Sequence, residues 1–238
     1  MSIKVPFTKE NLEDSLKALA KEFKKRGKGV PAEIILVGGA SVIINYGFRE
    51  SSYDIDAIYT LSSVMKEAIN AVGDSNNLPN GWLNDDFKKT PSYTNKIIEF
   101  SQYYKTFSNV LTIRTVRSEY LVAMKLISGR QYKQDLSDIA GIVYEQQVSG
   151  DPLSYERIDK AVIDLYGSWE KVSDYSKEIL DKILKCDDLK ALFIELSEDE
   201  AKAKEALAEV AKKYPEVVTG DNANDVIAAA LKKKKEKK

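Results

Sequence analysis

The sequence contains no histidine and only one cysteine, Cys186, among its 238 residues. The absence of histidine excludes Ser-His-Asp and Cys-His hydrolases, histidine-ligated zinc enzymes and histidine general bases. A single cysteine excludes an internal disulfide and a cysteine-based zinc cluster, and it is typical of a reducing cytoplasm. The chemistry that remains belongs to carboxylates, lysine, arginine and bound metal ions, which is sufficient for phosphoryl or nucleotidyl transfer.

The sequence also lacks a strong net charge and long apolar runs. Its 36 basic and 37 acidic residues give a net charge of −1, so any nucleic-acid contact would depend on a local basic patch. No apolar run approaches the roughly 20 residues of a membrane span, and the N-terminus lacks the pattern of a signal peptide. We therefore expect a cytoplasmic protein that does not contact a membrane.

The most informative stretch is residues 33–60, which reads EIILVGGASVIINYGFRESSYDIDAIYT. It begins with a β-branched apolar run, Glu33–Val37, and it ends with Asp54–Tyr59, which starts by alternating acidic and apolar residues. Both patterns predict strands. Between them, Ala40–Tyr46 is predicted to form a short helix.

The predicted strand-to-helix connection contains Gly38 and Gly39. Their backbone N–H groups are open to a phosphate, because no Cβ blocks the approach and a helix N-terminus carries partial positive charge. Ser41 could add a hydroxyl contact. Asp54 and Asp56 point to one side of the second strand, about 7 Å apart. Such carboxylates can share Mg²⁺ or Mn²⁺, which also bind substrate phosphates, so the stretch predicts a site for a nucleoside triphosphate and a divalent cation.

The fold class that we expect is α/β in the α+β sense. A small mixed sheet from Glu33 to about Val116 is flanked by helices and followed by an all-helical C-terminal region. The predicted domains are a catalytic core at 1–117, a helical domain at 118–231 and a lysine-rich, frayed tail at 232–238. The other predicted elements are helices from Thr8 to Gly27 and at 64–71, a loop at 73–80, strands at 96–101 and 109–117, and helices at 118–129, from 135, and at 154–166, 175–185, 189–195 and 197–213.

Two blocks of the sequence resemble a known superfamily. Gly38-Gly39, a spacer at 40–53 and Asp54-x-Asp56 resemble the signature of the DNA polymerase β-type nucleotidyltransferases. The second block, Tyr120–Ile139 (YLVAMKLISGRQYKQDLSDI), is similar to the lysine-bearing helix and acidic helix start of the AbiEii/MenT-like group. That group comprises nucleotidyltransferase toxins of bacterial and archaeal toxin-antitoxin systems and their uncharacterised relatives.

The resemblance implies that an acceptor hydroxyl attacks the α-phosphorus of a nucleoside triphosphate and that pyrophosphate leaves. Asp54 and Asp56 would be metal ligands, Lys125 would neutralise the triphosphate, and Asp138 would orient Lys125 or the acceptor. The implied catalytic residues are therefore Asp54, Asp56, Lys125 and Asp138, and the implied nucleotide-binding residues are Gly38, Gly39, Ser41, Lys125 and Arg130.

The resemblance further implies that the acceptor is an RNA, such as the 3′ end of a tRNA, or else a protein side chain. A toxin would also have a cognate antitoxin protein as a partner. Two alternatives are a small-molecule nucleotidyltransferase of the aminoglycoside-modifying kind and a catalytically inactive nucleotide-binding or protein-binding module of the same fold. A cleft lined by Arg114, Arg117, Arg130 and Lys133 would favour RNA.

Several candidate positions have a second interpretation, and one departs from the family pattern. Taken alone, Lys125 in mid-helix is typical of a lysine whose stem covers apolar surface. Tyr132 stands where relatives place an arginine, so both Arg130 and Lys133 are candidates for that role. Glu99 is the only strand-like candidate for a third carboxylate. The tetrad Trp82–Asp85 also recurs in relatives, and it is either near the site or a surface loop fixed by one buried tryptophan.

Overall fold

The structure is a computed structural model that describes residues 6–60, 62–220 and 222–235. These residues form two compact units. Unit 1 comprises Met1–Leu121 and Lys160–Gly167, and unit 2 comprises Val122–Asp159 and Ser168–Lys238, in each case within the described residues. The helices at 118–128 and 155–166 each contribute residues to both units.

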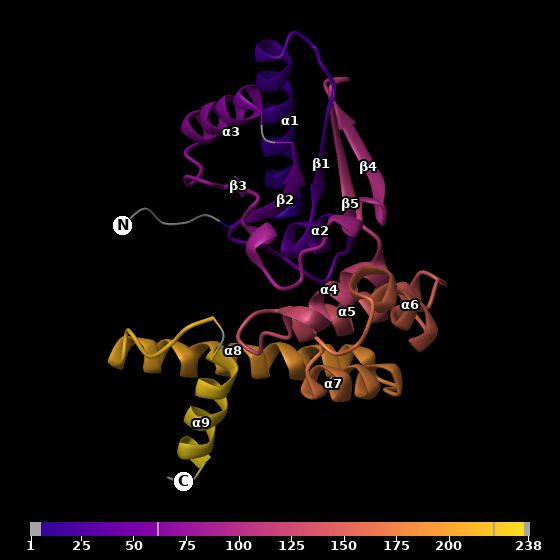
Figure 1. The fold of residues 1–238 in the computed structure, drawn as a ribbon, viewed down its shortest axis with the longest axis vertical. Coiled ribbons are helices and arrows are strands. Elements are labelled where there is room, and N and C mark those ends of the chain that lie inside the picture. Colours follow the sequence, from indigo (N-terminus) through magenta and orange to yellow (C-terminus); the bar gives the residue numbers. More distant parts are fainter. Residues whose placement is uncertain (1–5, 61, 221, 236–238) are drawn as a thin grey trace. The chain divides into compact units, whose positions relative to one another are not determined.

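The described part of unit 1 is built on a five-stranded sheet with the order β3-β2-β1-β5-β4 (Figure 1). The strands are β1 (Ala32–Leu36), β2 (Ile55–Tyr59), β3 (Leu83–Asn84), β4 (Ser101–Phe107) and β5 (Leu111–Val116). β1 pairs antiparallel with β2 and parallel with β5. β3 adds to β2 in parallel, and β4 adds to β5 in antiparallel orientation. The prediction of a mixed sheet flanked by helices is therefore confirmed.

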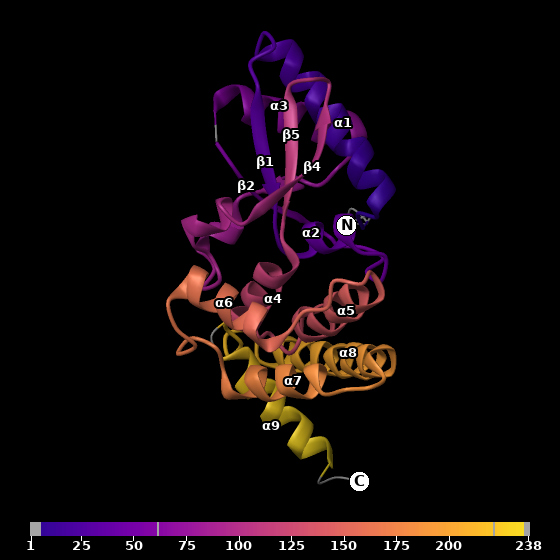
Figure 2. The same cartoon turned by 90° about the vertical axis from the view of Figure 1, so that its right-hand side faces the viewer.

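Helix α1 (Lys9–Arg26) forms where its capping residues predict it. The Thr8 side chain accepts a hydrogen bond from the Asn11 N–H, the Asn11 side chain accepts one from the Thr8 N–H, and Gly27 ends the helix. One apolar face of α1 joins α3 (Ser63–Asn76) and one face of the sheet in a common core (Figures 1 and 2). The remaining helical segments of unit 1 before residue 118 are α2 (Gly38–Asn45) and two 3₁₀ turns, η1 (Asp86–Lys89) and η2 (Asn95–Ile98).

Two predictions in unit 1 are wrong. The strand predicted at 96–101 is η2, because Thr94 caps this turn, and the strand itself follows at Ser101–Phe107. β4 lies at the sheet edge with mostly exposed polar residues, so its sequence carries no apolar run that would mark it. The loop predicted at 73–80 begins only after Asn76, because α3 includes Gly73, which lies against the Trp82 indole.

The described part of unit 2 is helical, as predicted for the C-terminal region. Its helices are the end of α4 (Ser118–Ser128), α5 (Asp135–Val148), the start of α6 (Tyr155–Tyr166), α7 (Asp174–Leu184), α8 (Leu189–Lys213) and α9 (Ala223–Lys235). α5 packs against α7 and α8, and α9 packs against α8 (Figure 2). No helix among the described residues is both long enough and apolar enough to cross a membrane.

The structure corrects two predictions in unit 2. The helices predicted at 189–195 and 197–213 are one helix, because the Ser197 hydroxyl donates to the Phe193 carbonyl inside α8 instead of capping a new start. The tail predicted at 232–238 is helical as far as Lys235, since α9 continues to that residue. The last three residues of that predicted tail lie outside the described residues.

Candidate functional site

The two glycines begin helix α2 directly after strand β1. Gly38 has φ of +53°, which favours glycine, and the capping residue Val37 provides no side-chain hydrogen bond to the helix start. The first N–H groups of a helix have no partner within the helix, so this turn can donate to an anion. The structure thus places Gly38 and Gly39 as the sequence predicts.

The acidic pair lies at the start of β2, the neighbour of β1 in the sheet. The Val37 N–H donates to the Asp56 carbonyl over 3.0 Å, and the Asp56 Oδ2 lies 3.5 Å from the point that a Cβ on Gly38 would occupy. Asp56 is half-buried, whereas Asp54 precedes the strand and is exposed. Gly38 and Asp56 are therefore close together, whereas Asp54, which was predicted to lie on the strand, immediately precedes β2.

Arg49 and Ser52 are close to the glycines, although the sequence analysis did not single them out. A Cβ on Gly39 would lie 2.8 Å from Arg49 Nη2 and 2.9 Å from Ser52 Oγ, so only glycine leaves room for both. Reciprocal backbone hydrogen bonds between Phe7 and Ser52 hold this segment. Arg49 is a basic residue between the Gly-Gly and Asp-x-Asp motifs, and this position is the signal in the sequence that could have indicated its place near the glycines.

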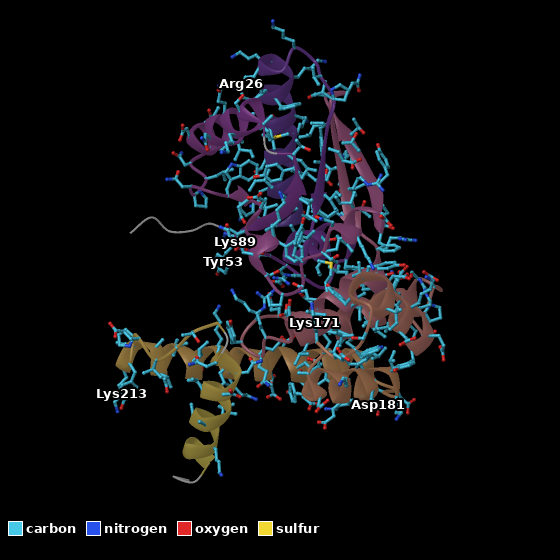
Figure 3. The ribbon with its side chains drawn as sticks, viewed as in Figure 1. Arg26, Tyr53, Lys89, Lys171, Asp181 and Lys213 are labelled. Atoms are coloured by element: carbon cyan, nitrogen blue, oxygen red, sulfur yellow. The ribbon has the colours of Figure 1, made fainter. Side chains whose placement is uncertain are left out.

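The tetrad Trp82–Asp85 is fixed by its tryptophan and lies next to the β2 strand. Trp82 is buried and its indole N–H donates to the Ile69 carbonyl over 3.0 Å, which fixes the loop. Asn84 on β3 is paired with Asp56 on β2, so the tetrad also lies beside the acidic pair. Tyr53, on the other side of Asp54 in sequence, is 56% exposed at the surface of unit 1 (Figure 3).

Two other candidates of unit 1 have different surroundings from those expected. Glu99 is exposed and follows η2 instead of lying on a strand, so it is not the third carboxylate of a sheet site. Ser41 is fully buried, and its hydroxyl accepts a hydrogen bond from the Val116 N–H over 3.2 Å. This bond ties α2 to the end of β5 and gives Ser41 a structural role.

The candidates of unit 2 form a buried charge cluster between α4 and α5. The Lys125 ammonium lies 2.8 Å from Asp135 Oδ1 and 2.7 Å from Asp138 Oδ2, and its side chain is 7% exposed. Lys125 is therefore not a solvated lysine with only its stem covered. Its charge is balanced by two carboxylates on the first turn of the following helix.

Arg130 joins the same cluster through Asp135. Its Nε lies 2.8 Å and its Nη2 3.2 Å from the two carboxylate oxygens of Asp135, and its backbone N–H donates to the same group. Burial would raise the pKa of Asp135, but the charges of Lys125 and Arg130 outweigh burial and hold this pKa well below its ordinary value. Asp135 is consequently an ion-pair partner of both Lys125 and Arg130.

Glu200 on α8 is a buried acid that the sequence analysis did not single out. Its carboxylate accepts hydrogen bonds from the Leu136 N–H over 2.8 Å, the Ser137 N–H over 3.4 Å and the Ser137 hydroxyl. Burial, with a smaller contribution from the charge of Asp138, raises the pKa of Glu200 to about 7 against the opposing hydrogen bonds. Glu200 thus caps the N-terminus of α5, although it lies on a distant helix.

The family comparison covers most of these residues. A family model described as "nucleotidyltransferase of unknown function (DUF6036)" matches residues 14–172, about two thirds of the chain. The chain belongs to the DUF6036 family. No curated protein and no solved structure matches it. The prediction of a nucleotidyltransferase is confirmed at this level, and the closer similarity to AbiEii/MenT-like toxins stays a prediction.

The region that matches DUF6036 covers the candidate residues of unit 1 and unit 2, but it does not cover every residue that holds their segments in place. It includes the Gly-Gly turn, the acidic pair and the Lys125 cluster, and it ends at residue 172, before α7. Glu200 therefore contacts the start of α5, at Leu136 and Ser137, from a helix that lies outside the matched region. The C-terminal helices of this chain complete the surroundings of candidate residues that the DUF6036 model itself covers.

Proposed function

We propose that this protein transfers a nucleotide from a nucleoside triphosphate to an acceptor hydroxyl in a metal-dependent reaction. The family assignment supports nucleotidyl transfer in general. The observation that carries the proposal further is the Asp56 carboxylate beside Gly38, at the N-terminal turn of α2. A phosphate and its counter-ion need this combination of backbone N–H groups and a carboxylate.

The chemistry of the acidic pair fits a hard divalent cation such as Mg²⁺ or Mn²⁺. Among the described residues no three or more histidine, cysteine, aspartate or glutamate side chains are grouped to hold a metal ion. Asp54 and Asp56 supply only carboxylate oxygens, which suit an ion that completes its coordination with phosphate oxygens and water. The ion when bound would neutralise the triphosphate and lower the pKa of the acceptor hydroxyl.

The residues of unit 1 have distinct roles in this proposal. The N–H groups of the α2 turn would donate to the phosphates, and Asp54 and Asp56 would hold the metal ion beside them. The acceptor oxygen forms a bond to the α-phosphorus while the bond from this phosphorus to pyrophosphate breaks, and the hydroxyl proton leaves to water. The pyrophosphate oxygen takes the electron pair of the broken bond.

For unit 2, the proposal keeps the predicted role of Arg130 and changes those of Lys125 and Asp138. Because Lys125 is buried between two aspartates, Arg130 is the better phosphate ligand of unit 2: its guanidinium is held by Asp135 and its side chain is 40% exposed. We therefore assign to Arg130, and not to Lys133, the role of the arginine that relatives place at the position of Tyr132. Lys125 and Asp138 would then hold the first turn of α5 in place.

For the acceptor we propose an RNA, and for the biological role a toxin with a cognate antitoxin protein. Both proposals are supported by the similarity of Gly38-Gly39, Asp54-x-Asp56 and Tyr120–Ile139 to the AbiEii/MenT-like group. The small-molecule and inactive-module alternatives predict different outcomes in the same experiment. A small-molecule enzyme would label a soluble acceptor, and an inactive module would bind a nucleotide without transferring it.

The deciding experiment supplies each α-labelled nucleoside triphosphate with Mg²⁺ and total RNA. We expect label in RNA with the wild-type protein, and a decrease of roughly 100-fold or more in Asp54→Asn, because a carboxylate ligand for the metal ion is lost. Asp54 is exposed, so this substitution leaves the fold intact. Asp14→Asn, an exposed acid on α1, is the matched control and should retain full labelling. Nucleotide binding without label in RNA, protein or small acceptors would overturn the proposal.

A further inference from the structure

The loop between α4 and α5 is held from both sides by one residue of the C-terminal helix. Asn224 on α9 donates from its Nδ2 to the Gly129 carbonyl over 3.1 Å. Its Oδ1 accepts from the Gln131 N–H, also over 3.1 Å. These two bonds flank Arg130, so a single amide side chain fixes the backbone on either side of it.

The loop needs such support because its backbone is unusual. Gly129 has φ of +49°, a conformation that a side chain disfavours, and a Cβ there would lie 2.7 Å from Ser176 Oγ. The loop follows the end of α4 and has no strand partner to satisfy its peptide groups. Asn224 supplies both a donor and an acceptor, through the two different atoms of its amide group.

The other end of the same segment is held in a comparable way. Glu200 on α8 accepts from the Leu136 and Ser137 N–H groups at the start of α5. Residues 129–137, which include Arg130 and Asp135, are therefore held by α8 at one end and by α9 at the other. Both supporting helices lie beyond residue 172, outside the family match.

We propose that Asn224 is a positioning residue for Arg130, and that the C-terminal helix α9 is thereby part of the phosphate-binding apparatus of unit 2. The inference rests on the proposed function in one respect, the role of Arg130 as a phosphate ligand. A bidentate guanidinium contact depends on orientation, and the Arg130 side chain starts from the backbone that Asn224 fixes. Asn224 acts only through Arg130 and does not itself touch the substrate.

The first test measures the loop without any activity. Trypsin cleaves after Arg130 only when the loop opens, and loss of two hydrogen bonds should raise the cleavage rate at the Arg130–Gln131 bond roughly tenfold or more in Asn224→Ala. Mass spectrometry identifies the cleaved bond. Asp225→Ala, at an exposed neighbour on α9, is the matched control and should cleave at the wild-type rate. An unchanged rate at this bond in Asn224→Ala would overturn the proposal.

A second variant keeps the test valid if Asn224→Ala opens the whole of unit 2, which faster cleavage at all sites would reveal. Asn224→Asp retains the acceptor for Gln131 and loses the donor to Gly129, so the added cleavage should concentrate at the bond after Arg130. Equal acceleration at every site in this variant as well would show that Asn224 supports the fold in general and not the loop, which would contradict the proposal.

The third test asks whether Asn224 acts through Arg130 in the reaction. We expect Asn224→Ala to raise the KM for the nucleoside triphosphate roughly tenfold with a small change in kcat, and to have no further effect in an Arg130→Ala background. Additive effects of the two substitutions would overturn the link between them. If no variant and no wild type transfers nucleotide while the trypsin result holds, the proposed function fails and the positioning of the loop by Asn224 stands.

Discussion

At the scale of single residues, substitution of Gly38 can distinguish the cost of backbone strain from the loss of a phosphate-binding site. A Cβ on Gly38 would meet only Asp56 Oδ2, at an ordinary 3.5 Å, so Gly38→Ala has room but an unfavourable φ of +53°. We expect a loss of about 1 kcal/mol in unfolding free energy from the left-handed conformation. We also expect a decrease of at least tenfold in nucleotide affinity, because the Cβ would occupy the approach of a phosphate to the α2 turn. Calorimetry and nucleotide titration measure the two quantities.

Gly29→Ala is the control that isolates the backbone cost. Gly29 has φ of +82° and no atom within 4 Å of its Cβ position, so it shares the strain and not the surroundings. Equal nucleotide affinity in the two alanine variants would contradict the proposed phosphate site.

Substitution of Lys125 tests whether this residue acts mainly in folding, through its charge, or mainly in the reaction. Lys125→Met removes the cation between Asp135 and Asp138, while Asp135 keeps Arg130 as a partner. Removing one partner of a buried ion pair typically costs about 3–5 kcal/mol, so the unfolding free energy of unit 2 in denaturant should decrease by that order. Lys190→Met, at an exposed lysine on α8, should leave the stability within about 0.5 kcal/mol of wild type. Loss of nucleotidyl transfer with unchanged stability would instead assign Lys125 mainly to the reaction.

At the scale of secondary-structure elements, the sequence predicts correctly those helices and strands that carry a local signal, such as a capping residue or an apolar pattern. The Thr8 cap, the β-branched run before Gly38 and the alternation at Asp54–Tyr59 all predict elements that the structure contains. The strand β4 was missed because an edge strand needs no apolar pattern. The break predicted between residues 195 and 197 is absent, since the Ser197 hydroxyl donates to the Phe193 carbonyl within the continuous helix α8. Tertiary packing, and not local propensity, decides such segments.

The same distinction holds for the candidate site. Motif spacing placed Gly38 next to Asp56, because β1 and β2 are neighbours joined through the short helix α2. It could not place Arg49, whose contact with Gly39 depends on the path of the intervening loop. Glu200 and Asn224 were out of reach for a stronger reason. They approach residues 129–137 from helices distant in sequence, and no local pattern records such a contact.

At the scale of the whole molecule, we expect Glu200 to dominate the dependence of stability on pH between pH 4.5 and 7. The described residues form two compact units, so unfolding need not be a single two-state transition, and Glu200 belongs to unit 2. Burial raises the pKa of Glu200 from 4.5 to about 7, which means that the folded chain holds a proton that the unfolded chain has released over this range. Raising the pH from 4.5 to 7 should therefore destabilise unit 2, by on the order of 3 kcal/mol.

Glu200→Gln tests this expectation with little change of shape. Glutamine keeps an acceptor for the Leu136 N–H and can donate to the Ser137 oxygen, so the cap on α5 survives without a titratable group. We expect the variant to lose the decline in unfolding free energy between pH 4.5 and 7, and to match or exceed wild-type stability at pH 8. The lowered pKa of Asp135 acts in the opposite direction and only below about pH 4, where its protonation removes stability, so it does not mask the effect. Glu205→Gln, at an exposed site on α8, should retain the wild-type profile. A wild-type profile in Glu200→Gln would show that other groups titrate in this range and that Glu200 is ionised throughout.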